Sequence, residues 1–451
     1  MRLILASLAM LLGASTTPAA APPAARGAPP AAPDAYTLEH ALTLRSFSGL
    51  AWSADGLRLA FVVSENDTAE TSTNQDIWLW QAGADSARRL TRHAKNDWSP
   101  SFSPGGDTIA FASARATGDD AKPGIYMLSL RGGEPWAFGL YDESINEVAG
   151  SPDGRWLACV KPDTLPKQVR EWRKKKWDQV VEDERLQYPH LWVVEVATGR
   201  QRRLTSGPQW VWNARWTPDS RTIAFLTSPS GKPDDGNLVD IGVIPVTGGP
   251  MRKLGVIGNG SFAWSPDGRW IALAAPADRA KHVEKEDLWV VPASGGRAIN
   301  LTAGFDEDAH APIWSPGSDT LYFHAAQGVT TVVAAVARSG GEVTLSTDRE
   351  AAAGAPVAAS TGRVAWIQSA PAVPTEIRVA DHIRLPGRAV TALNAALTKL
   401  PLGVTRSVSW RSSDGVMVGG LLLRPARAPT GAPLKTLVLL HGGPYGARYA
   451  L

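Results

Sequence analysis

Short apolar runs separated by turn residues recur through most of the chain and predict β-strands. In one well-defined unit, Ser261 to Trp264 leads into a Ser-Pro-Asp-Gly turn, and Trp270 to Ala274 follows as the return strand. A third run covers Asp287 to Val291, and beyond the Gly295-Gly296 pair a fourth covers Ala298 to Leu301. Proline presets φ in such a turn, and Asp-Gly favours a chain reversal. The unit is therefore predicted to contain four strands.

The turn of this unit recurs at a nearly fixed period. Aligned on the first residue of the turn, the copies begin at Ser53, Ser103, Ser151, Thr217, Ser265, Ser315 and Ser360. Successive copies lie 45 to 50 residues apart, except for one interval of 66. Four strands in a unit of this length are typical of a propeller blade, and six intervals define seven units. The sequence thus predicts an all-β fold, a seven-bladed β-propeller over residues 37–397, in which the turn aspartates serve turn geometry.

Composition agrees with this prediction and excludes several functions. The chain has 18 Trp against five Met and seven Tyr, and most of the Trp are expected to pack between neighbouring sheets. With 46 basic and 43 acidic residues, it lacks the excess charge of a nucleic-acid-binding protein. A single cysteine, Cys159, excludes an intramolecular disulfide. The eight His residues form no metal-binding motif, so neither a metal nor another cofactor is expected.

The N-terminus has the pattern of an export signal. Met1-Arg2 precedes an uncharged apolar run from Leu3 to Leu12, and small residues follow up to Ala21. The run is too short to span a bilayer. We expect a signal peptide over residues 1–21 and a Pro/Ala linker over 22–36. The protein would then be exported, periplasmic or secreted, without a membrane contact after signal cleavage.

The interval of 66 residues contains a charged insertion at about 162–189. Between Gln168 and Arg185, basic side chains are followed by acidic ones, and Trp172 and Trp177 lie among them. This pattern predicts a helical excursion from the propeller. Its simplest interpretation is a solvated helix that rests its tryptophans on the ring.

The pattern changes after Leu397. Thr405 to Arg411 and Val416 to Arg424 predict a β-hairpin, and Thr436 to Leu440 predicts a continuous apolar strand that ends in His441-Gly442-Gly443-Pro444. Such a strand requires cover on both faces of its sheet. A strand ending in His-Gly-Gly resembles the segment before the first helix of α/β-hydrolases, where a glycine-loop N–H forms half of the oxyanion hole. Residues 398–451 are therefore predicted to begin an α/β-hydrolase domain.

These features together resemble the prolyl oligopeptidase family of serine peptidases, in particular its acylaminoacyl-peptidase and dipeptidyl-peptidase branch. The resemblance implies that the N–H of Gly443 points at the oxyanion, while Gly442 and His441 shape the loop and His441 stays outside the catalytic triad. It also offers Glu182 and Glu184 as candidates for binding the amino group of a short peptide substrate. Their spacing differs from the adjacent Glu pair familiar in that branch.

The sequence departs from the family in one respect. In α/β-hydrolases the catalytic Ser, Asp and His follow the oxyanion strand, and no Gly-x-Ser-x-Gly sequence occurs in the 451 residues. We expect the propeller and oxyanion-strand portion of an exported serine peptidase, with a truncated catalytic domain that is inactive alone. The alternative is a non-catalytic, TolB-like periplasmic propeller for protein binding or scaffolding. Whether the chain forms a homo-oligomer is left open.

Overall fold

The computed structural model describes residues 36–440, except 69–70, 117–121, 178–186, 233–234, 236–237, 256–260, 279–283, 346–350, 429–430 and 432. The expected signal peptide and nearly all of the expected linker lie within residues 1–35, outside the described residues. No described helix is long and apolar enough to cross a membrane.

Nearly all of the described secondary structure is β, and most of it forms sheets of four antiparallel strands that follow one another in sequence. The first sheet contains β1 (Ser46–Trp52), β2 (Arg58–Asp67), β3 (Ser72–Gln81) and β4 (Arg88–Arg89). The second contains β5 (Asp97–Phe102), β6 (Thr108–Ser113), β7 (Gly124–Ser129) and β8 (Trp136–Leu140). The third contains β9 (Glu147–Gly150), β10 (Trp156–Pro162), β11 (Pro189–Glu195) and β12 (Gln201–Arg203).

Two further four-stranded sheets continue the series. The fourth contains β13 (Trp210–Trp216), β14 (Thr222–Ser228), β15 (Asp240–Pro245) and β16 (Arg252–Lys253). The fifth contains β17 (Phe262–Trp264), β18 (Trp270–Pro276), β19 (Glu286–Pro292) and β20 (Ile299–Asn300). The four strands of this fifth sheet match the four apolar runs predicted for the same unit.

The sixth sheet is larger, with nine strands. Its first part contains β21 (Ala309–Trp314), β22 (Thr320–Gln327), β23 (Thr330–Ala337) and β24 (Thr344–Leu345). Its second part contains β25 (Ala352–Ala353), β26 (Val357–Ala358), β27 (Val364–Ala370), β28 (Val373–Ala380) and β29 (Arg388–Ala389). The parts meet in one parallel pairing, between Thr331 and Ala352. The remaining described elements are α1 (Leu38–Leu42), α2 (Lys167–Lys174), the 3-10 helix η2 (Ala395–Lys399), and a hairpin of β30 (Val404–Arg411) and β31 (Met417–Arg424).

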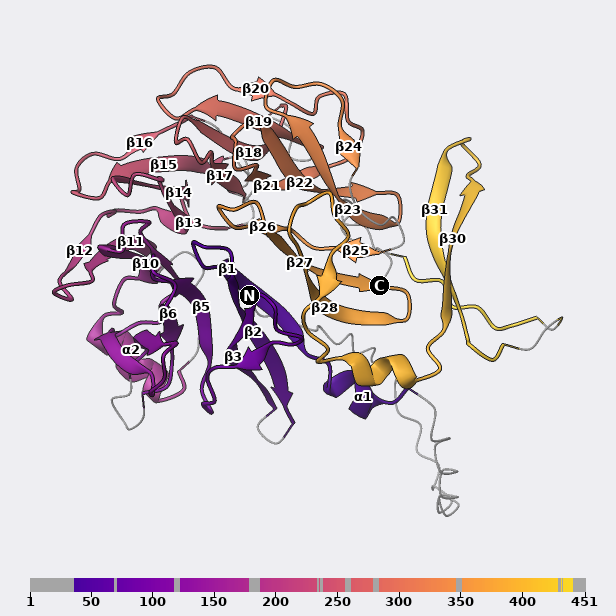
Figure 1. Ribbon diagram of the computed structural model, residues 1–451, viewed down its shortest axis with the longest axis horizontal. Helices are drawn as coiled ribbons and strands as arrows, with labels where there is room; N and C mark the ends of the chain where they lie inside the picture. The colour runs from indigo at the N-terminus through magenta and orange to yellow at the C-terminus, as the bar shows by residue number, and fades with distance from the viewer. Residues whose placement is uncertain are drawn as a thin grey trace, which may run out of the picture. The chain divides into compact units, whose positions relative to one another are not determined.

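Buried apolar side chains join each sheet to the next one. Val62 of the first sheet packs with Phe111 of the second, and Phe225 of the fourth packs in a group with Val193 of the third. In a further group, Phe61 of the first sheet packs with Ile377 of β28. The packing therefore runs from sheet to sheet and returns to the first one (Figure 1).

The recurrent tryptophans connect neighbouring sheets by hydrogen bonds as well as by packing. The indole Nε1 of Trp216 donates to the carbonyl oxygen of Ala149 at 2.9 Å, and that of Trp314 donates to Ala263 at 3.1 Å. Each bond joins a sheet to the one before it. The predicted role of these tryptophans in packing between sheets is confirmed, and the indole N–H adds a directional contact to it.

The recurrent turns show why aspartate suits them. The Asp267 carboxylate accepts hydrogen bonds from Ser265 Oγ at 2.5 Å and from the backbone N–H of Arg269 at 3.0 Å. Desolvation acts in the opposite direction, but these bonds outweigh it and lower the pKa of Asp267 to about 2. The carboxylate is thus engaged within its own turn, as the sequence predicts.

Two turns carry serine where the others carry glycine. Ser220 and Ser318 have φ of 62° and 59°, in the left-handed region that favours glycine. The Oγ atoms of these residues accept hydrogen bonds from the backbone N–H of Asp153 and of Asp267, in the turns of the preceding sheets, at 3.0 and 3.2 Å. The contact between neighbouring turns offsets the conformational cost of serine at these positions.

Candidate functional site

The sheets share one edge at which the other parts of the chain are attached. In the first sheet this edge holds the start of β1 and the end of β2, since Ser46 pairs with Ser64. The chain enters β1 at this edge, coming from α1. After β29 it returns to the same edge before η2 and the hairpin, since Asn394, next to η2, accepts a hydrogen bond from the N–H of Arg45. We call this the connection edge. The helix α2 leaves the third sheet at the corresponding edge, between β10 and β11.

Buried charges lie along the connection edge of the first sheet. Asp76 in the middle of β3 is 3% exposed and forms an ion pair with Arg89. Its other oxygen accepts a hydrogen bond from Thr91 Oγ1 at 3.0 Å. A buried carboxylate is tolerated only when it is paired and hydrogen-bonded in this way. The cluster therefore holds the end of the sheet together.

The second sheet has an equivalent pair at the start of β5. Asp97 is fully buried and contacts Arg115 at 2.5 Å and Ser113 Oγ at 2.5 Å. Burial raises the pKa of Asp97, although the neighbouring donors oppose the shift. The Arg115 guanidinium also lies over the rings of Phe111 and Tyr126, 5.2 and 5.1 Å from their centroids. Arg115 is thereby held in one orientation.

A third cluster lies beside the base of α2. Asp163 contacts Arg203 at 3.0 Å and the buried His190 at 3.4 Å. Burial and the positive charge of Arg203 lower the pKa of His190, against the opposing effect of Asp163. These contacts anchor the residues from which the α2 insertion departs.

The fourth cluster contains the most exposed imidazole of the set. His310 Nδ1 lies 2.8 Å from Glu286 Oε2, and the side chains of the two residues are 41% and 9% exposed. The hydrogen bond with Glu286 raises the pKa of His310 despite partial burial, and the charge of Asp308 acts in the same direction. A carboxylate thus orients an imidazole at the connection edge and favours its charged form.

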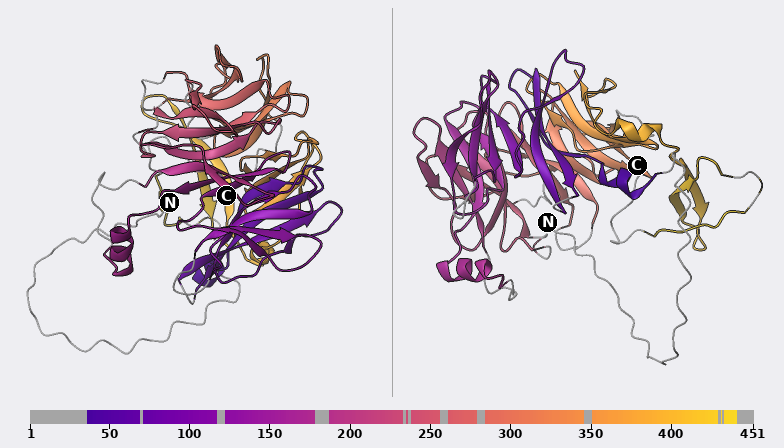
Figure 2. Two further views of the ribbon diagram at one scale, coloured as in Figure 1. Left: turned by 90° about the vertical axis from the view of Figure 1, so that its left-hand side faces the viewer. Right: turned by 90° about the horizontal axis from the view of Figure 1, so that it is seen from below.

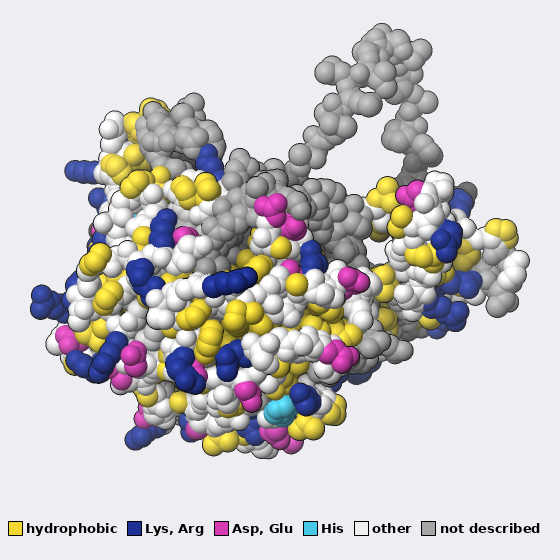
Figure 3. Space-filling view, turned by 90° about the horizontal axis from the view of Figure 1, so that it is seen from above, with side chains coloured by type: hydrophobic (Ala, Val, Ile, Leu, Met, Phe, Trp, Pro, Cys, Tyr) yellow, Lys and Arg dark blue, Asp and Glu magenta, His cyan; other side chains and the backbone are white. Residues whose placement is uncertain are grey.

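Together these clusters neutralise the connection edge. Most of their charges are paired within the edge, and among the described residues no group of three or more His, Cys, Asp or Glu is placed to hold a metal ion. On the side of the molecule seen from above Figure 1, acidic side chains are also interspersed among Lys and Arg (Figure 3). Such an edge can support an attached domain without leaving buried charges unpaired.

The site residues predicted from the sequence lie outside the described residues. His441, Gly442 and Gly443 fall within 441–451, and Glu182 and Glu184 fall within 178–186. Their predicted roles therefore stay predictions. The described chain does reach the segments on either side of Glu182 and Glu184, at Trp177 and Gln187.

The predicted hairpin forms, but the predicted apolar strand after it does not. β30 pairs with β31 along its whole length, and Asp414 in the turn accepts a hydrogen bond from the N–H of Val416 at 3.1 Å. Residues 433–440 adopt no regular structure, and Leu437 and Leu440 are 82% and 89% exposed. A strand requires a partner strand to pair its backbone, and none among the described residues adjoins this segment.

Comparisons with known proteins find similarity in both sequence and fold. No protein-family model matches the chain. A protein called uncharacterized peptidase YuxL, from Bacillus subtilis (strain 168), is 23% identical over 431 residues, which cover 88% of this chain and 65% of the relative. The solved structure of acylaminoacyl peptidase from Pyrococcus horikoshii has a TM-score of 0.69 at 16% identity, covering 90% of this chain and 62% of the other. The chain resembles prolyl oligopeptidase-family peptidases.

Two other solved structures support this resemblance at the level of the fold. A structure of prolyl endopeptidases has a TM-score of 0.60 at 12% identity, covering 86% of this chain and 55% of the other. The β-propeller domain of the Trilobed protease from Pyrococcus furiosus has a TM-score of 0.53 at 14% identity, covering 77% of this chain and 95% of that domain. The chain therefore spans less than two thirds of the prolyl oligopeptidase-type relatives it matches, but nearly all of a propeller domain.

Sequence analysis missed a repeated structural threonine at the connection edge. The hydroxyl oxygens of Thr91, Thr205, Thr302 and Thr391 each accept a hydrogen bond at 2.9 Å from a backbone N–H of the third strand in the same repeat. A signal was present, because each of these threonines follows a Leu or Val after the fourth strand of its repeat. The edge charges have no such local signal, since their partners lie in different strands.

Proposed function

We propose that this chain is the propeller and oxyanion-strand portion of an exported serine peptidase that hydrolyses short peptides. The observation that carries the proposal is the similarity to a peptidase over 88% of the chain, together with the fold shared with acylaminoacyl peptidase. A non-catalytic, TolB-like scaffold is the alternative, and it explains the sequence similarity to a peptidase less directly.

In this proposal residues 37–397 are a propeller of seven blades. The nine-stranded sheet counts as two blades, because β21 to β24 and β26 to β29 each repeat the strand order of the other sheets. Contacts between the turns of neighbouring sheets support a ring. Arg363 donates to the carbonyl oxygen of Gly56 at 2.8 Å, and Arg58 donates to that of Gly106 at 2.9 Å, so the last turn meets the first and the first meets the second.

Residues 398–451 are proposed to begin the hydrolase domain. The described part of this segment leaves large apolar side chains uncovered, including those of Trp410, Leu423 and Val438. Exposed apolar surface of this kind marks a site that another layer of protein covers. In the complete peptidase, the strands and helices of the hydrolase domain would provide that cover.

The proposed chemistry places the N–H of Gly443 at the oxyanion, with Gly442 and His441 shaping the loop. Glycine allows the backbone to approach a tetrahedral intermediate closely, and one such donor contributes about 3 kcal/mol to its stability. The catalytic Ser, Asp and His would lie outside residues 1–451, which contain no Gly-x-Ser-x-Gly sequence. Glu182 and Glu184 are proposed to bind the free amino group of the peptide.

A fluorophosphonate probe tests where the nucleophile lies. The 451-residue chain and the product of its complete coding sequence are incubated with the probe and with short peptide p-nitroanilides. We expect labelling and hydrolysis only if the coding sequence supplies a nucleophile beyond these residues. Labelling of the 451-residue chain itself would overturn the proposal that it lacks one. A coding sequence without a hydrolase domain would favour the scaffold.

Two substitutions in the active full-length protein test the proposed site. Gly443→Pro removes the backbone N–H, and we expect kcat to fall by about 100-fold or more. A Glu182→Gln/Glu184→Gln variant should raise KM for peptides with a free amino terminus and leave KM for N-acylated peptides unchanged. An equal effect on both substrates would contradict amino-group recognition.

The N-terminal pattern further leads us to propose export to the periplasm or the medium. Its test is fractionation of cells that express the whole chain. We expect a processed form, shortened by about the length of a signal peptide, outside the cytoplasm. An unprocessed cytoplasmic protein would contradict this part of the proposal and leave the peptidase proposal intact.

A further inference from the structure

The helix α2 stands apart from the sheets. Both views of Figure 2 show it beside the propeller sheets rather than within them. It is anchored at its base, where the buried Leu165 donates its N–H to Glu143 Oε1 at 3.0 Å. Beyond this anchor, none of the described side chains of residues 167–177 is buried. We call residues 167–177 the α2 arm.

The α2 arm carries a concentrated positive charge. It contains six Lys and Arg residues and one acidic residue, Glu171, and four acidic residues, Asp178, Glu182, Asp183 and Glu184, follow it in the sequence. Lys174 lies 3.8 Å from Glu171, and the two side chains are 67% and 50% exposed, so solvent screens this pair. Lys175 and Lys176 are also exposed. Outside the arm, the chain is close to neutral, with 40 basic and 42 acidic residues.

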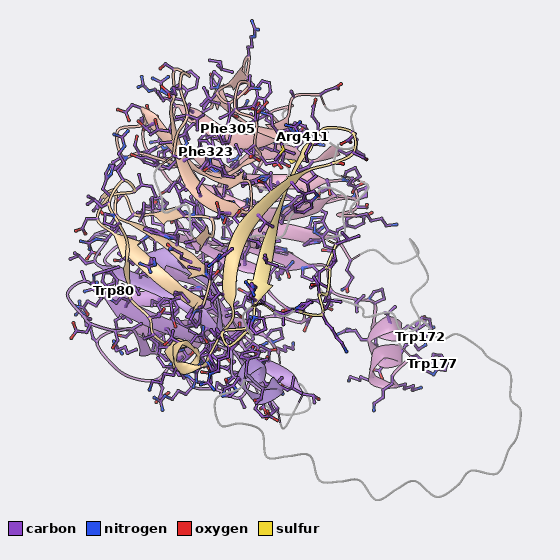
Figure 4. All side chains as sticks on the ribbon, turned by 90° about the vertical axis from the view of Figure 1, so that its right-hand side faces the viewer. Trp80, Trp172, Trp177, Phe305, Phe323 and Arg411 are labelled. Atoms are coloured by element: carbon purple, nitrogen blue, oxygen red, sulfur yellow. The ribbon has the colours of Figure 1, made fainter. Side chains whose placement is uncertain are left out.

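Two tryptophans lie within this charge. The rings of Trp172 and Trp177 are 6.2 Å apart between centroids, and Trp177 is 65% exposed. Figure 4 shows both at the end of the molecule away from Trp80, which is buried in the first sheet. The sequence predicts that these tryptophans rest on the ring; Trp177 is instead exposed on the projecting arm. An exposed indole beside Lys is typical of side chains that settle at the interface of a membrane.

We propose that the α2 arm binds anionic phospholipid surfaces. Lys and Arg near such a surface each strengthen binding by about fivefold, and the indole rings gain from entering the interface. A projecting arm reaches a flat bilayer without obstruction by the sheets. An acidic peptide would meet the same charges, but it would leave the exposed Trp177 ring largely in water. The combination of charge and indole therefore favours lipid, and it revises the expectation that no membrane is contacted.

The arm requires no catalytic group, so its test is independent of the peptidase proposal. The 451-residue chain is sedimented with vesicles of phosphatidylglycerol and phosphatidylcholine, and with vesicles of phosphatidylcholine alone. We expect binding to the anionic vesicles that weakens steeply with added salt. Equal binding to both kinds of vesicle, or no binding to either, would overturn the proposal. Binding to polyglutamate but not to anionic vesicles would also overturn it.

Matched variants assign the binding to the arm. Neutralising three charges in Lys174→Gln/Lys175→Gln/Lys176→Gln should lower the partition coefficient by about 100-fold. The control Arg200→Gln/Lys253→Gln/Lys399→Gln removes the same net charge from exposed positions elsewhere and should change it less than threefold. Equal losses in the two variants would overturn the assignment.

A second pair of variants tests the aromatic contribution. We expect Trp177→Ala to weaken binding by about tenfold. The blue shift that vesicles induce in the tryptophan fluorescence should also lose the part that Trp177 contributes. Trp136→Ala, at a site that is 47% exposed on β8, is the control and should leave both unchanged. Unchanged thermal unfolding of Trp177→Ala would show that the loss is not due to misfolding. Unchanged binding by Trp177→Ala would overturn the role of the indole.

Discussion

Asn394 and Arg45 are joined by two reciprocal hydrogen bonds across 349 residues of sequence. The Asn394 Oδ1 accepts from the backbone N–H of Arg45 at 2.8 Å, and its Nδ2 donates to the Arg45 carbonyl oxygen at 2.9 Å. The same Nδ2 donates to Thr375 at 2.8 Å. β1 and β28 lie in different sheets and share no backbone pairing. The buried side-chain amide of Asn394 therefore connects the start of the first sheet to the end of the last one.

Substitution of this amide should weaken the junction between the first and the last sheet. Asn394→Ala leaves the backbone groups of Arg45 and the carbonyl of Thr375 without their partner, and we expect the free energy of unfolding to fall by about 3 kcal/mol. Urea denaturation followed by tryptophan fluorescence measures the change. Asn66→Ala is the control, since Asn66 makes one exposed bond to Leu42 and its loss should cost under about 0.5 kcal/mol. A similar cost for both variants would contradict this role of Asn394.

Two equivalent tryptophans in neighbouring sheets separate hydrogen bonding from packing. Trp314 Nε1 donates to Ala263, whereas the buried Nε1 of Trp264 has no hydrogen-bond partner among the described residues. Trp314→Phe should therefore destabilise the protein by about 1 kcal/mol more than Trp264→Phe, because only Trp314 loses an indole hydrogen bond. Thermal unfolding of the two variants gives the difference. Equal destabilisation would show that the indole bond contributes little.

The pair of His310 and Glu286 makes stability depend on pH. Because the hydrogen bond with Glu286 raises the pKa of His310, the contribution of the pair is complete below an unfolded pKa of about 6.5 and is lost as pH rises through the folded pKa. His310→Gln should thus cost more stability at about pH 5.5 than at about pH 8.5. Solvent screening of the partly exposed imidazole limits the difference to under about 1 kcal/mol.

A double-mutant cycle isolates that effect from other titrating groups. Burial lowers the pKa of the nearby His324, so His324 has the opposite influence on stability as pH falls. In a Glu286→Gln background, the pH-dependent cost of His310→Gln should shrink, because the main carboxylate that favours the imidazolium is gone and only the charge of Asp308 still acts in that direction. An undiminished pH dependence in that background would assign it to another group.

Cys159 should be inert in the folded protein. Its thiol is fully buried in β10, and burial raises its pKa to about 12, so almost no thiolate is present at neutral pH. We expect no reaction with iodoacetamide under native conditions and one equivalent of labelling in urea, measured by mass spectrometry. Native labelling at a rate near that of a free thiol would show that β10 opens readily.

Some features of this fold are determined by residues that lie close together in the sequence. The Ser-Pro-Asp-Gly turns and the strands beside them could be predicted, because the proline, the Asp side chain and the apolar runs act within a few residues. The fifth unit illustrates this: the runs 270–274 and 287–291 lie within β18 (Trp270–Pro276) and β19 (Glu286–Pro292). The hairpin around Asp414 was predictable for the same reason, since its carboxylate bonds to the N–H two residues later.

Other features were decided only by the tertiary structure. The burial of Asp97 against Arg115 and the bond between Asn394 and Arg45 depend on which elements become neighbours, and no local pattern encodes that. The apolar run at 436–440 is a case in which the local pattern alone does not form the predicted element. Its sequence favours a buried strand, but a strand forms only where another strand pairs its backbone and a further layer covers its side chains. The exposed position of Trp177 was likewise decided in three dimensions, because the sequence fixes its neighbours on the arm and not its distance from the sheets.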